Sequence, residues 1–335
     1  MIRKRRQMVC LFILAASASL VFFVVNRPRV LIIQSVSAES NRSKLFKDGW
    51  ARSLEEKHLL AKLSWYSLEQ DRYPQSEART AGAFQAISRE RPDLVVLVDD
   101  AANERVGRSL AAEGKTPLLF VGIDQTPNNY GYGGNAHISG IVEHIRLEPF
   151  HELLSILYPG MSLKYGVIGV DNPSGRARLE QIHNCTWSQH ILSDSILVRD
   201  FSEWKEFINR HQDFDVLLIL NVDSLDNHIG EQGTISVREV VNWTEVNSKP
   251  LPMGVEADYV ANGGGLAFEF SPRRFGELAS SRTKDWLNIK NAPPLDYLHA
   301  KDFQVSMCRS RLAVRDIEIP EIYEESAFLS GTLYP

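Results

Sequence analysis

The sequence predicts an α/β protein built from two similar halves, each a parallel sheet flanked by helices. Short apolar runs stop abruptly at acidic or turn residues, as at residues 94–98, which Asp99 and Asp100 follow. The runs at residues 118–121 and 138–142 end in the same way. Apolar runs separated by helical segments are typical of parallel strands buried on both faces. With 335 residues, 44% of them hydrophobic, the chain is long enough for two domains.

The first half alternates strands and helices. The expected elements, in chain order, are a strand at 30–33, a helix at 40–60, a strand at 63–68, a helix at 74–91, a strand at 94–98 and a helix at 101–112. Pro74 can open the second helix, which ends near Pro92 because the residue before a proline avoids the helical conformation. Asp100 can cap the third helix, since a carboxylate there accepts hydrogen bonds from first-turn amides.

The second half repeats this alternation. The expected elements are a helix at 149–157, a strand at 164–170, a helix at 174–183, a strand at 196–198, a helix at 201–211 and a strand at 216–220. The last residues, 318–335, are acidic and then apolar, and we expect them to pack as a final helix. Two halves with the same order of elements predict two lobes of similar construction.

Composition and motifs exclude several functions. A net charge of −5 and a pI near 6.0 leave no basic surface for phosphate backbones, so nucleic acid is not an expected partner. The sequence has no GxSxG or HExxH motif, and we expect a protein that is not an enzyme. Three cysteines without a CxxC spacing argue against structural zinc, and no cofactor is expected. We expect Cys185 and Cys308 to be separate thiols, with a disulfide as the alternative in an oxidising compartment.

The N-terminus predicts export. Basic residues at 3–6 precede an uncharged segment at 8–25, which is about long enough to cross a bilayer. The charge bias places the N-terminus in the cytoplasm and the body on the other side. A cleaved signal peptide is the alternative, because residues 16–18 imitate a cleavage site, but the apolar run continues beyond them. We expect residues 1–27 to form a basic flank and an uncleaved membrane anchor.

Several segments together resemble a known family. They are RPDLVVLV at 91–98, PLLFVGID at 117–124, HISGIVE at 137–143, LPMGVE at 251–256, GGLAF at 264–268 and DFQVSM at 302–307. In order and spacing they resemble the substrate-binding proteins of bacterial ABC transporters that have a type I periplasmic-binding fold, in the subgroup that includes aromatic amino acid binders. The similarity covers nearly everything after residue 30.

The resemblance implies two lobes, joined by three crossing segments, that close on a small ligand. Residues 28–140 with about 257–300 would form lobe 1, and residues 141–256 with about 301–335 would form lobe 2. Ligand contacts that both lobes make only when closed would shift the population toward the closed state. The resemblance also implies an ABC permease as partner, and a periplasmic body held at the bacterial inner membrane by the N-terminal transmembrane helix.

In this fold the ligand contacts come from loops at strand ends. The candidate ligand-binding residues are therefore Ser35, Ser37, Trp65, Asp99, Asp100, Asp124, Glu143, Asp171, Asn172, Asn221, Asp223 and Glu256. The set is rich in acids. Asp99 and Asp100 stand where relatives often carry Gly-Thr before a helix that accepts an anionic group, and a carboxylate there would compete for the helix amides.

These residues favour a ligand that carries an amine or another cation. Asp124 or Glu143 could meet the charge, and Trp65 or Tyr66 could stack on it, since aromatic faces attract cations. The alternative is purely structural: Trp65 would lie in the core, and the acids would cap helices or face solvent.

Two other classes of function remain open at this stage. The protein could be a tethered periplasmic sensor that docks on a membrane signalling partner, which a retained anchor favours. It could also be an adhesive or assembly factor that binds no ligand. A crevice without ligand contacts would distinguish this last class.

Overall fold

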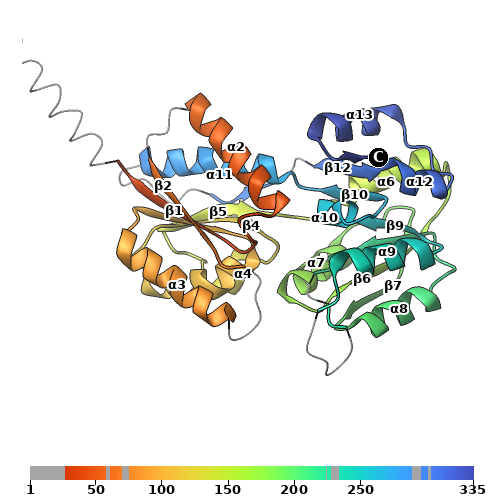
Figure 1. Cartoon of the computed structure of the whole chain (residues 1–335), viewed down its shortest axis with the longest axis horizontal. Coiled ribbons are helices and arrows are strands. Elements are labelled where there is room, and N and C mark those ends of the chain that lie inside the picture. Colours follow the sequence, from red (N-terminus) through yellow and green to blue (C-terminus); the bar gives the residue numbers. More distant parts are fainter. Residues whose placement is uncertain are drawn as a thin grey trace, which may run out of the picture. The chain divides into compact units, whose positions relative to one another are not determined.

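The computed structural model describes residues 27–57, 61–69, 75–223, 225–227, 234–288, 296–300 and 303–335, which form two compact units (Figure 1). Unit 1 consists of the chain up to Val121 with Tyr130–Gly140 and Gly276–Asp296, and unit 2 of Gly122–Asn129, Ile141–Phe275 and Tyr297–Pro335. The expected anchor at 8–25 lies outside the described residues. Among the residues that are described, no helix is long and apolar enough to cross a membrane.

The first sheet has six strands in the order β11-β5-β4-β3-β1-β2. They are β1 (Arg29–Gln34), β2 (Lys62–Ser67), β3 (Leu94–Val98), β4 (Leu118–Ile123), β5 (Ile138–Val142) and β11 (Leu298–His299). The pairs β1–β2, β1–β3, β3–β4 and β5–β11 are parallel. Every residue of β3, β4 and β5 is buried, which confirms the prediction of central strands covered on both faces.

Helices cover both faces of this sheet. They are α2 (Asn41–Lys57), α3 (Gln75–Glu90), α4 (Asp100–Ala102), a π-helical turn η1 (Asn103–Gly107), α5 (Arg108–Glu113) and α11 (Pro272–Asn288). In Figure 1, α2 and α11 lie on one side of the strands and α3 on the other. A Cβ atom at Gly276 would lie 2.0 Å from the carbonyl oxygen of Phe46, so only glycine lets α11 approach the α2 backbone this closely.

The predicted helix at 101–112 differs from the structure at its start. The helix begins at Asp100, and Asp99 before it has a φ of 70° and no capping side-chain hydrogen bond. The carboxylate of Asp100 does not cap the helix; it accepts a hydrogen bond from the Tyr130 hydroxyl. Ser35, from the end of β1, supplies the cap instead, because its hydroxyl accepts from the Ala102 amide at 3.0 Å.

The second sheet has seven strands in the order β13-β12-β10-β9-β8-β6-β7. They are β6 (Lys164–Val170), β7 (Ile191–Val198), β8 (Val216–Ile219), β9 (Leu251–Gly254), β10 (Leu266–Glu269), β12 (Gln304–Cys308) and β13 (Leu333–Tyr334). The β10–β12 pair is antiparallel, whereas β6–β7, β6–β8, β8–β9, β9–β10 and β12–β13 are parallel.

Two apolar cores cover the two faces of the second sheet. The helices are α6 (Glu148–Leu157), α7 (Pro173–Asn184), α8 (Phe201–Arg210), α9 (Val237–Asn247), α10 (Ala257–Ala261), α12 (Arg309–Val314) and α13 (Glu321–Ser330). The first core joins α6, α7, α12 and α13 to the strands, and the second joins α8, α9 and α10 to them. The final helix predicted at 318–335 therefore exists, with Ala327 of α13 fully buried.

The unit boundaries differ from those expected for the lobes. Residues 257–275 lie in unit 2, whereas residues 257–300 are expected in lobe 1. They lie in unit 2 because β10 pairs with β9 on one side and with β12 on the other. Residues 122–129 also lie in unit 2 rather than in the first half.

A group of buried rings in unit 2 contains two histidines. His151 lies 4.7 Å from His190, 5.8 Å from Tyr165 and 5.9 Å from Trp187 between ring centroids. Nδ1 of His190 accepts a hydrogen bond from the Leu163 amide at 3.3 Å, so this nitrogen carries no proton. Burial, with a smaller contribution from His190, lowers the pKa of His151 to about 4, and burial also lowers the pKa of His190. Both rings are therefore neutral in the folded state at neutral pH.

We expect acid to destabilise unit 2 through His151. Its folded-state pKa lies below the unfolded value of about 6.5, so its contribution to stability is complete above about pH 6.5 and is lost as the pH falls toward about 4. The variant His151→Leu removes this titration. Between about pH 7 and pH 4.5 the wild type should lose about 1 to 2 kcal/mol more free energy of unfolding than the variant does, after allowance for solvent screening.

Urea unfolding at the two pH values measures this difference. His183→Leu is the matched control, because His183 is exposed on α7 of the same unit. Equal losses of stability in the wild type and in His151→Leu would show that His151 does not make the protein sensitive to acid.

Candidate functional site

Four acids of unit 2 lie around one buried arginine of the same unit. Arg178 of α7 is 4% exposed, and its Nε donates to Asp124 at 3.0 Å. Its Nη1 lies 2.6 Å from a Glu256 carboxylate oxygen and donates to the Leu220 carbonyl at 2.8 Å. Glu143 and Asp223 also interact electrostatically with Arg178. We call Arg178, Asp124, Glu143, Asp223 and Glu256 the Arg178 cluster.

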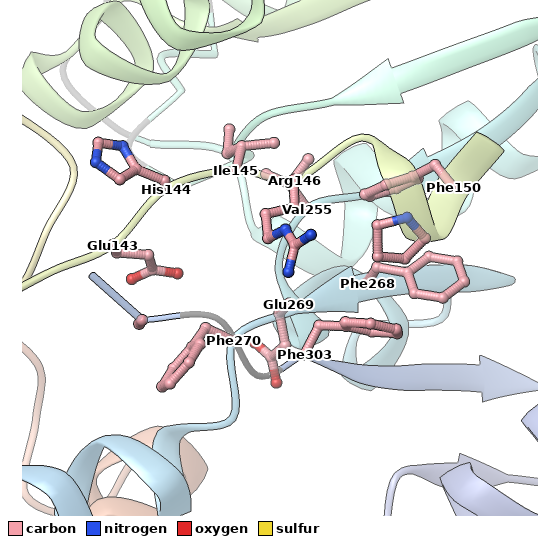
Figure 2. A pocket seen from close by; sticks show the side chains of 12 residues that line it. Glu143, His144, Ile145, Arg146, Phe150, Val255, Phe268, Glu269, Phe270 and Phe303 are labelled. Carbon is pink, nitrogen blue, oxygen red and sulfur yellow. The ribbon is translucent and has the colours of Figure 1, made fainter. Parts of the chain in front are cut away.

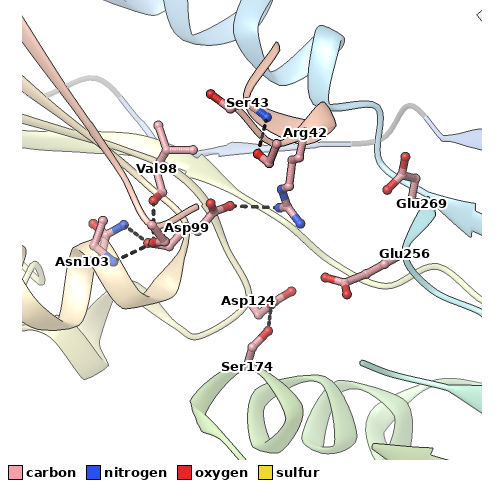
Figure 3. Close-up of polar contacts among 12 residues, drawn as sticks. Arg42, Ser43, Val98, Asp99, Asn103, Asp124, Ser174, Glu256 and Glu269 are labelled. Carbon is pink, nitrogen blue, oxygen red and sulfur yellow. Dashed lines mark hydrogen bonds and ion pairs between the residues drawn. The ribbon is translucent and has the colours of Figure 1, made fainter. Parts of the chain in front are cut away.

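Each acid of the cluster follows the carboxyl end of a strand. Asp124 and Glu143 come directly after β4 and β5 of the first sheet, and Asp223 and Glu256 come shortly after β8 and β9 of the second. Arg178 comes from the interior of α7, which begins at Pro173. Figure 3 shows Asp124 and Glu256, with Ser174 donating its hydroxyl to Asp124.

The Arg178 cluster is rich in acids. Burial opposes the charge of Arg178, but Asp124, Glu256 and Glu143 attract it and raise its pKa well above the usual value. Burial and repulsion from Glu256 raise the pKa of Asp223, whereas Arg178 lowers it. Four carboxylates thus lie around the guanidinium of Arg178, and two of them, Asp223 and Glu256, repel each other.

Neighbouring polar groups hold the cluster in place. Gln181, one turn after Arg178, donates its side-chain amide to the Asp124 carbonyl at 2.6 Å. Asn172 caps α7 by accepting from the Gly175 amide at 2.8 Å, and it also accepts from Asn221 at 3.0 Å. The other end of the Asn221 amide accepts from Val170 at 2.7 Å. Asn172 and Asn221 thus fix the backbone between β6 and α7.

Asp171 has a different environment from the acids of the cluster. Its carboxylate lies 2.6 Å from Arg176 and 3.2 Å from Arg199, and hydrogen bonds to these side chains lower its pKa. Asp171 is therefore an acid that basic neighbours neutralise. Of the acids predicted in the second half, Glu143, Asp223 and Glu256 join the Arg178 cluster and Asp171 does not.

In unit 1 the predicted residues separate into two groups. Arg42 of α2 pairs with Asp99 at 2.9 Å, as Figure 3 shows. Asp99 lies at the carboxyl end of β3 with a left-handed backbone, a conformation that is uncommon outside glycine. Ser37 is partly buried in the turn after β1, where its hydroxyl accepts from the Glu39 amide at 3.3 Å. By contrast, Ser35 is buried, and its hydroxyl contacts the backbone. It donates to the Val98 carbonyl and accepts from the Ala102 amide.

Trp65 and Tyr66, which are expected to stack on a ligand, each contact a helix of unit 1. Trp65 packs against Phe46 at 6.2 Å and Trp50 at 5.9 Å, both from α2. Tyr66 donates its hydroxyl to the Arg79 carbonyl of α3 at 2.9 Å. Successive side chains of a strand point to opposite faces, so each of these two rings is covered by a different helix. They belong to the packing of unit 1.

An open recess in unit 2 begins beside the Arg178 cluster (Figure 2). Its empty space is about 400 Å³, which includes space open to solvent. The lining residues are Glu143, His144, Ile145, Arg146, Pro149, Phe150, Val255, Phe268, Glu269, Phe270, Ala300 and Phe303. The lining mixes phenylalanines with the charged side chains of Glu143, Glu269 and Arg146, so the recess offers both apolar and polar contacts.

Metal and disulfide chemistry find no support in the described residues. No group of three or more His, Cys, Asp or Glu side chains in that part of the chain could hold a metal ion. Cys185 and Cys308 are not joined to each other. Cys308 is buried and lies 3.1 Å from the Pro335 carbonyl, and burial raises the pKa of Cys185.

Sequence reasoning did not find Arg178 or Arg42. Both lie within helices, whereas the candidate residues are those that follow strands. The many acids at the strand ends could have indicated them, because clustered carboxylates need basic partners. The helices that follow those strands are the nearest source of such partners.

Comparison with known proteins gives the fold. No protein-family model and no curated protein sequence matches the chain. Solved structures do match: a conserved domain protein from Vibrio cholerae has a TM-score of 0.64 at 16% identity, covering 92% of this chain and 100% of the other. An ABC domain in complex with L-Trp from Streptococcus pneumonia has a TM-score of 0.63 at 15% identity, covering 89% and 98%. A ligand-free, open substrate-binding protein with adhesive properties from Clostridium difficile has a TM-score of 0.65 at 14% identity, covering 88% and 96%.

The chain has the two-lobed type I periplasmic-binding fold. The match spans nearly the full length of each of these structures, so the fold predicted from the sequence is confirmed for the body of the chain. In open α/β sheets, ligands bind beyond the carboxyl ends of the strands, and Asp124, Glu143 and Glu256 follow such ends.

Removing the charge of Arg178 should strongly destabilise the protein. The variant Arg178→Met removes the cation that contacts buried Asp124 and partly buried Glu256, which should cost about 3 to 5 kcal/mol of the free energy of unfolding. Urea unfolding at neutral pH measures the loss. The matched control is Arg176→Met on the same helix, whose exposed ion pair with Asp171 should contribute less than about 1 kcal/mol. Similar losses for the two variants would contradict a central role of Arg178.

Proposed function

We propose that the protein is an extracytoplasmic solute-binding protein whose two lobes close on a small organic ligand that carries an amine, such as an amino acid, and that presents this ligand to an ABC permease. The type I fold supports a binding role, since two of the similar structures are named as an ABC domain and a substrate-binding protein. The observation that carries the choice of ligand is that the carboxylates of Asp223 and Glu256 repel each other beside Arg178.

The chemistry of the cluster favours a cation over an anion. Arg178 is already engaged by Asp124 and Glu256, so a ligand carboxylate would meet a guanidinium that two carboxylates share. An ammonium group has three donors and one positive charge, and it would reduce the repulsion between Asp223 and Glu256. Hydrogen bonds between charged groups contribute about 1.5 to 3 kcal/mol each in a partly desolvated site.

The recess adds a preference for an apolar substituent. Glu143 belongs both to the Arg178 cluster and to the recess, whose wall includes Phe268 and Phe270. An amine with an aromatic or branched side chain could place its charge at Glu143 and its apolar part against these rings. The similar structure from Streptococcus pneumonia holds L-Trp, a ligand with both features. No bond needs to change in such a complex, and we propose binding without catalysis.

The proposed location follows from the N-terminus. Residues 3–6 and the uncharged segment 8–25 would hold the body at the outer face of the bacterial inner membrane. A protease that is added to intact spheroplasts should then degrade the body but leave a short, membrane-bound N-terminal fragment. A body that is released in full with the periplasmic fraction would instead indicate a cleaved signal peptide.

A thermal-shift screen tests the ligand class. A ligand that binds only the folded state raises the melting temperature, so the protein is screened against amino acids, amines, sugars, nucleosides and dicarboxylates. We expect amines or amino acids to raise the melting temperature and dicarboxylates to leave it unchanged. Stabilisation by anions alone would refute the cationic ligand. If no compound stabilises the protein, the solute-binding proposal fails, and the tethered sensor is then tested by capture of membrane partners.

For a compound that binds, Asp223→Asn should raise the Kd by about ten-fold or more, because it removes one charge-assisted hydrogen bond. Isothermal titration calorimetry measures the change. The matched control is Asp213→Asn, since Asp213 is an exposed acid of the same unit before the amino end of β8. An equal effect of both variants would point to long-range charge instead of contact with Asp223.

A further inference from the structure

The side chains of two histidines contact each other where β5 and β11 of the first sheet end. His144 follows β5, and His299 is the last residue of β11. Nε2 of His144 lies 3.0 Å from Nδ1 of His299, and the ring planes differ by 12°. The ring centroids are 5.1 Å apart. Nearly parallel rings at this separation with two nitrogens in contact lie side by side in almost one plane, which is the geometry of an N–H···N hydrogen bond.

This contact needs one proton between the two nitrogens. A neutral pair, or a pair with a single positive charge, can supply one N–H donor and one bare acceptor. When both rings are imidazolium, an N–H faces an N–H and two positive charges meet, so the contact must open. The bond is thus compatible with neutral pH and incompatible with full protonation.

The pair reinforces a short strand pairing. The strand β11 has two residues, and Leu298 and His299 are in register with Ile141 and Val142 of β5. The Ala300 amide donates to the Val142 carbonyl at 3.0 Å. Two of the points at which the chain passes between the units, after Gly140 and after Asp296, lie next to this pairing. A pairing of two residues has few backbone hydrogen bonds, so its stability depends on contacts between the side chains at its end.

The groups around His144 shift its pKa. Burial and the charge of His299 lower the pKa of His144, whereas Asp124 and a hydrogen bond with Gln181 of α7 raise it, the first two effects being the larger. On its own segment, Glu143 and Arg146 are the nearest charged neighbours in sequence, and Arg146 pairs with Glu148 at 3.4 Å. The net effect lowers the pKa of His144, so this ring becomes protonated only in acid.

We infer that the His144–His299 pair is a proton-sensitive clasp, which holds β11 against β5 at neutral pH and releases it in mild acid. This inference goes beyond the proposed function and does not rest on it. In Figure 2, His144 stands near Glu143 at the edge of the recess, and Ala300 lines the same recess, so release of the clasp would also change this surface.

Hydrogen exchange of the Ala300 amide, followed by NMR on the intact protein, tests the clasp. Between about pH 7 and pH 5, after correction for intrinsic exchange, the protection of this amide in the wild type should fall by about five-fold or more. In His299→Gln the protection should change less than about two-fold over the same range, because glutamine does not titrate. His144→Gln gives a second test in case the first variant folds poorly.

The matched control is His183→Gln, which removes an exposed histidine of unit 2 and should behave as the wild type. Two outcomes would overturn the inference. One is a wild-type protection factor that is the same at both pH values. The other is an equal loss of protection in the wild type and in both clasp variants.

Discussion

The burial of one positive charge at the carboxyl edge of the second sheet is the constraint on which the candidate site depends. Arg178 can be buried because Asp124 and Glu256 contact it and the Leu220 carbonyl accepts a further hydrogen bond from it. These partners follow three different strands, β4 of the first sheet and β8 and β9 of the second. The same contacts that stabilise the buried charge therefore also shape the site.

The balance between structural and binding roles differs among the acids. Asp124 is committed to Arg178 and Ser174, and Asp171 is neutralised by two arginines. Asp223 is instead held in a region where burial and Glu256 disfavour its ionised form. A bound cation would have its largest effect on the carboxylate whose ionised form the protein stabilises least. Among the acids of the cluster, that carboxylate is Asp223.

The sequence predicts the fold well and the site only in part. Apolar runs such as β3 and β4 are visible because buried parallel strands need no polar face, and the acids after them follow from the same pattern. Arg178 could not be found in this way, since nothing in a helix sequence shows which side chain turns toward a strand end. The packing of Trp65 against α2 could not be predicted for a related reason, because it depends on tertiary structure.

The environments of the two cysteines bear on how the chain would fold under oxidising conditions. Cys308 is buried, and the raised pKa of Cys185 keeps the thiolate, the form that reacts with oxidants and disulfides, at a low population. Both thiols lie in unit 2, yet neither is joined to the other. Slow thiol chemistry at Cys185 would therefore limit incorrect cross-links while the chain folds in an oxidising compartment.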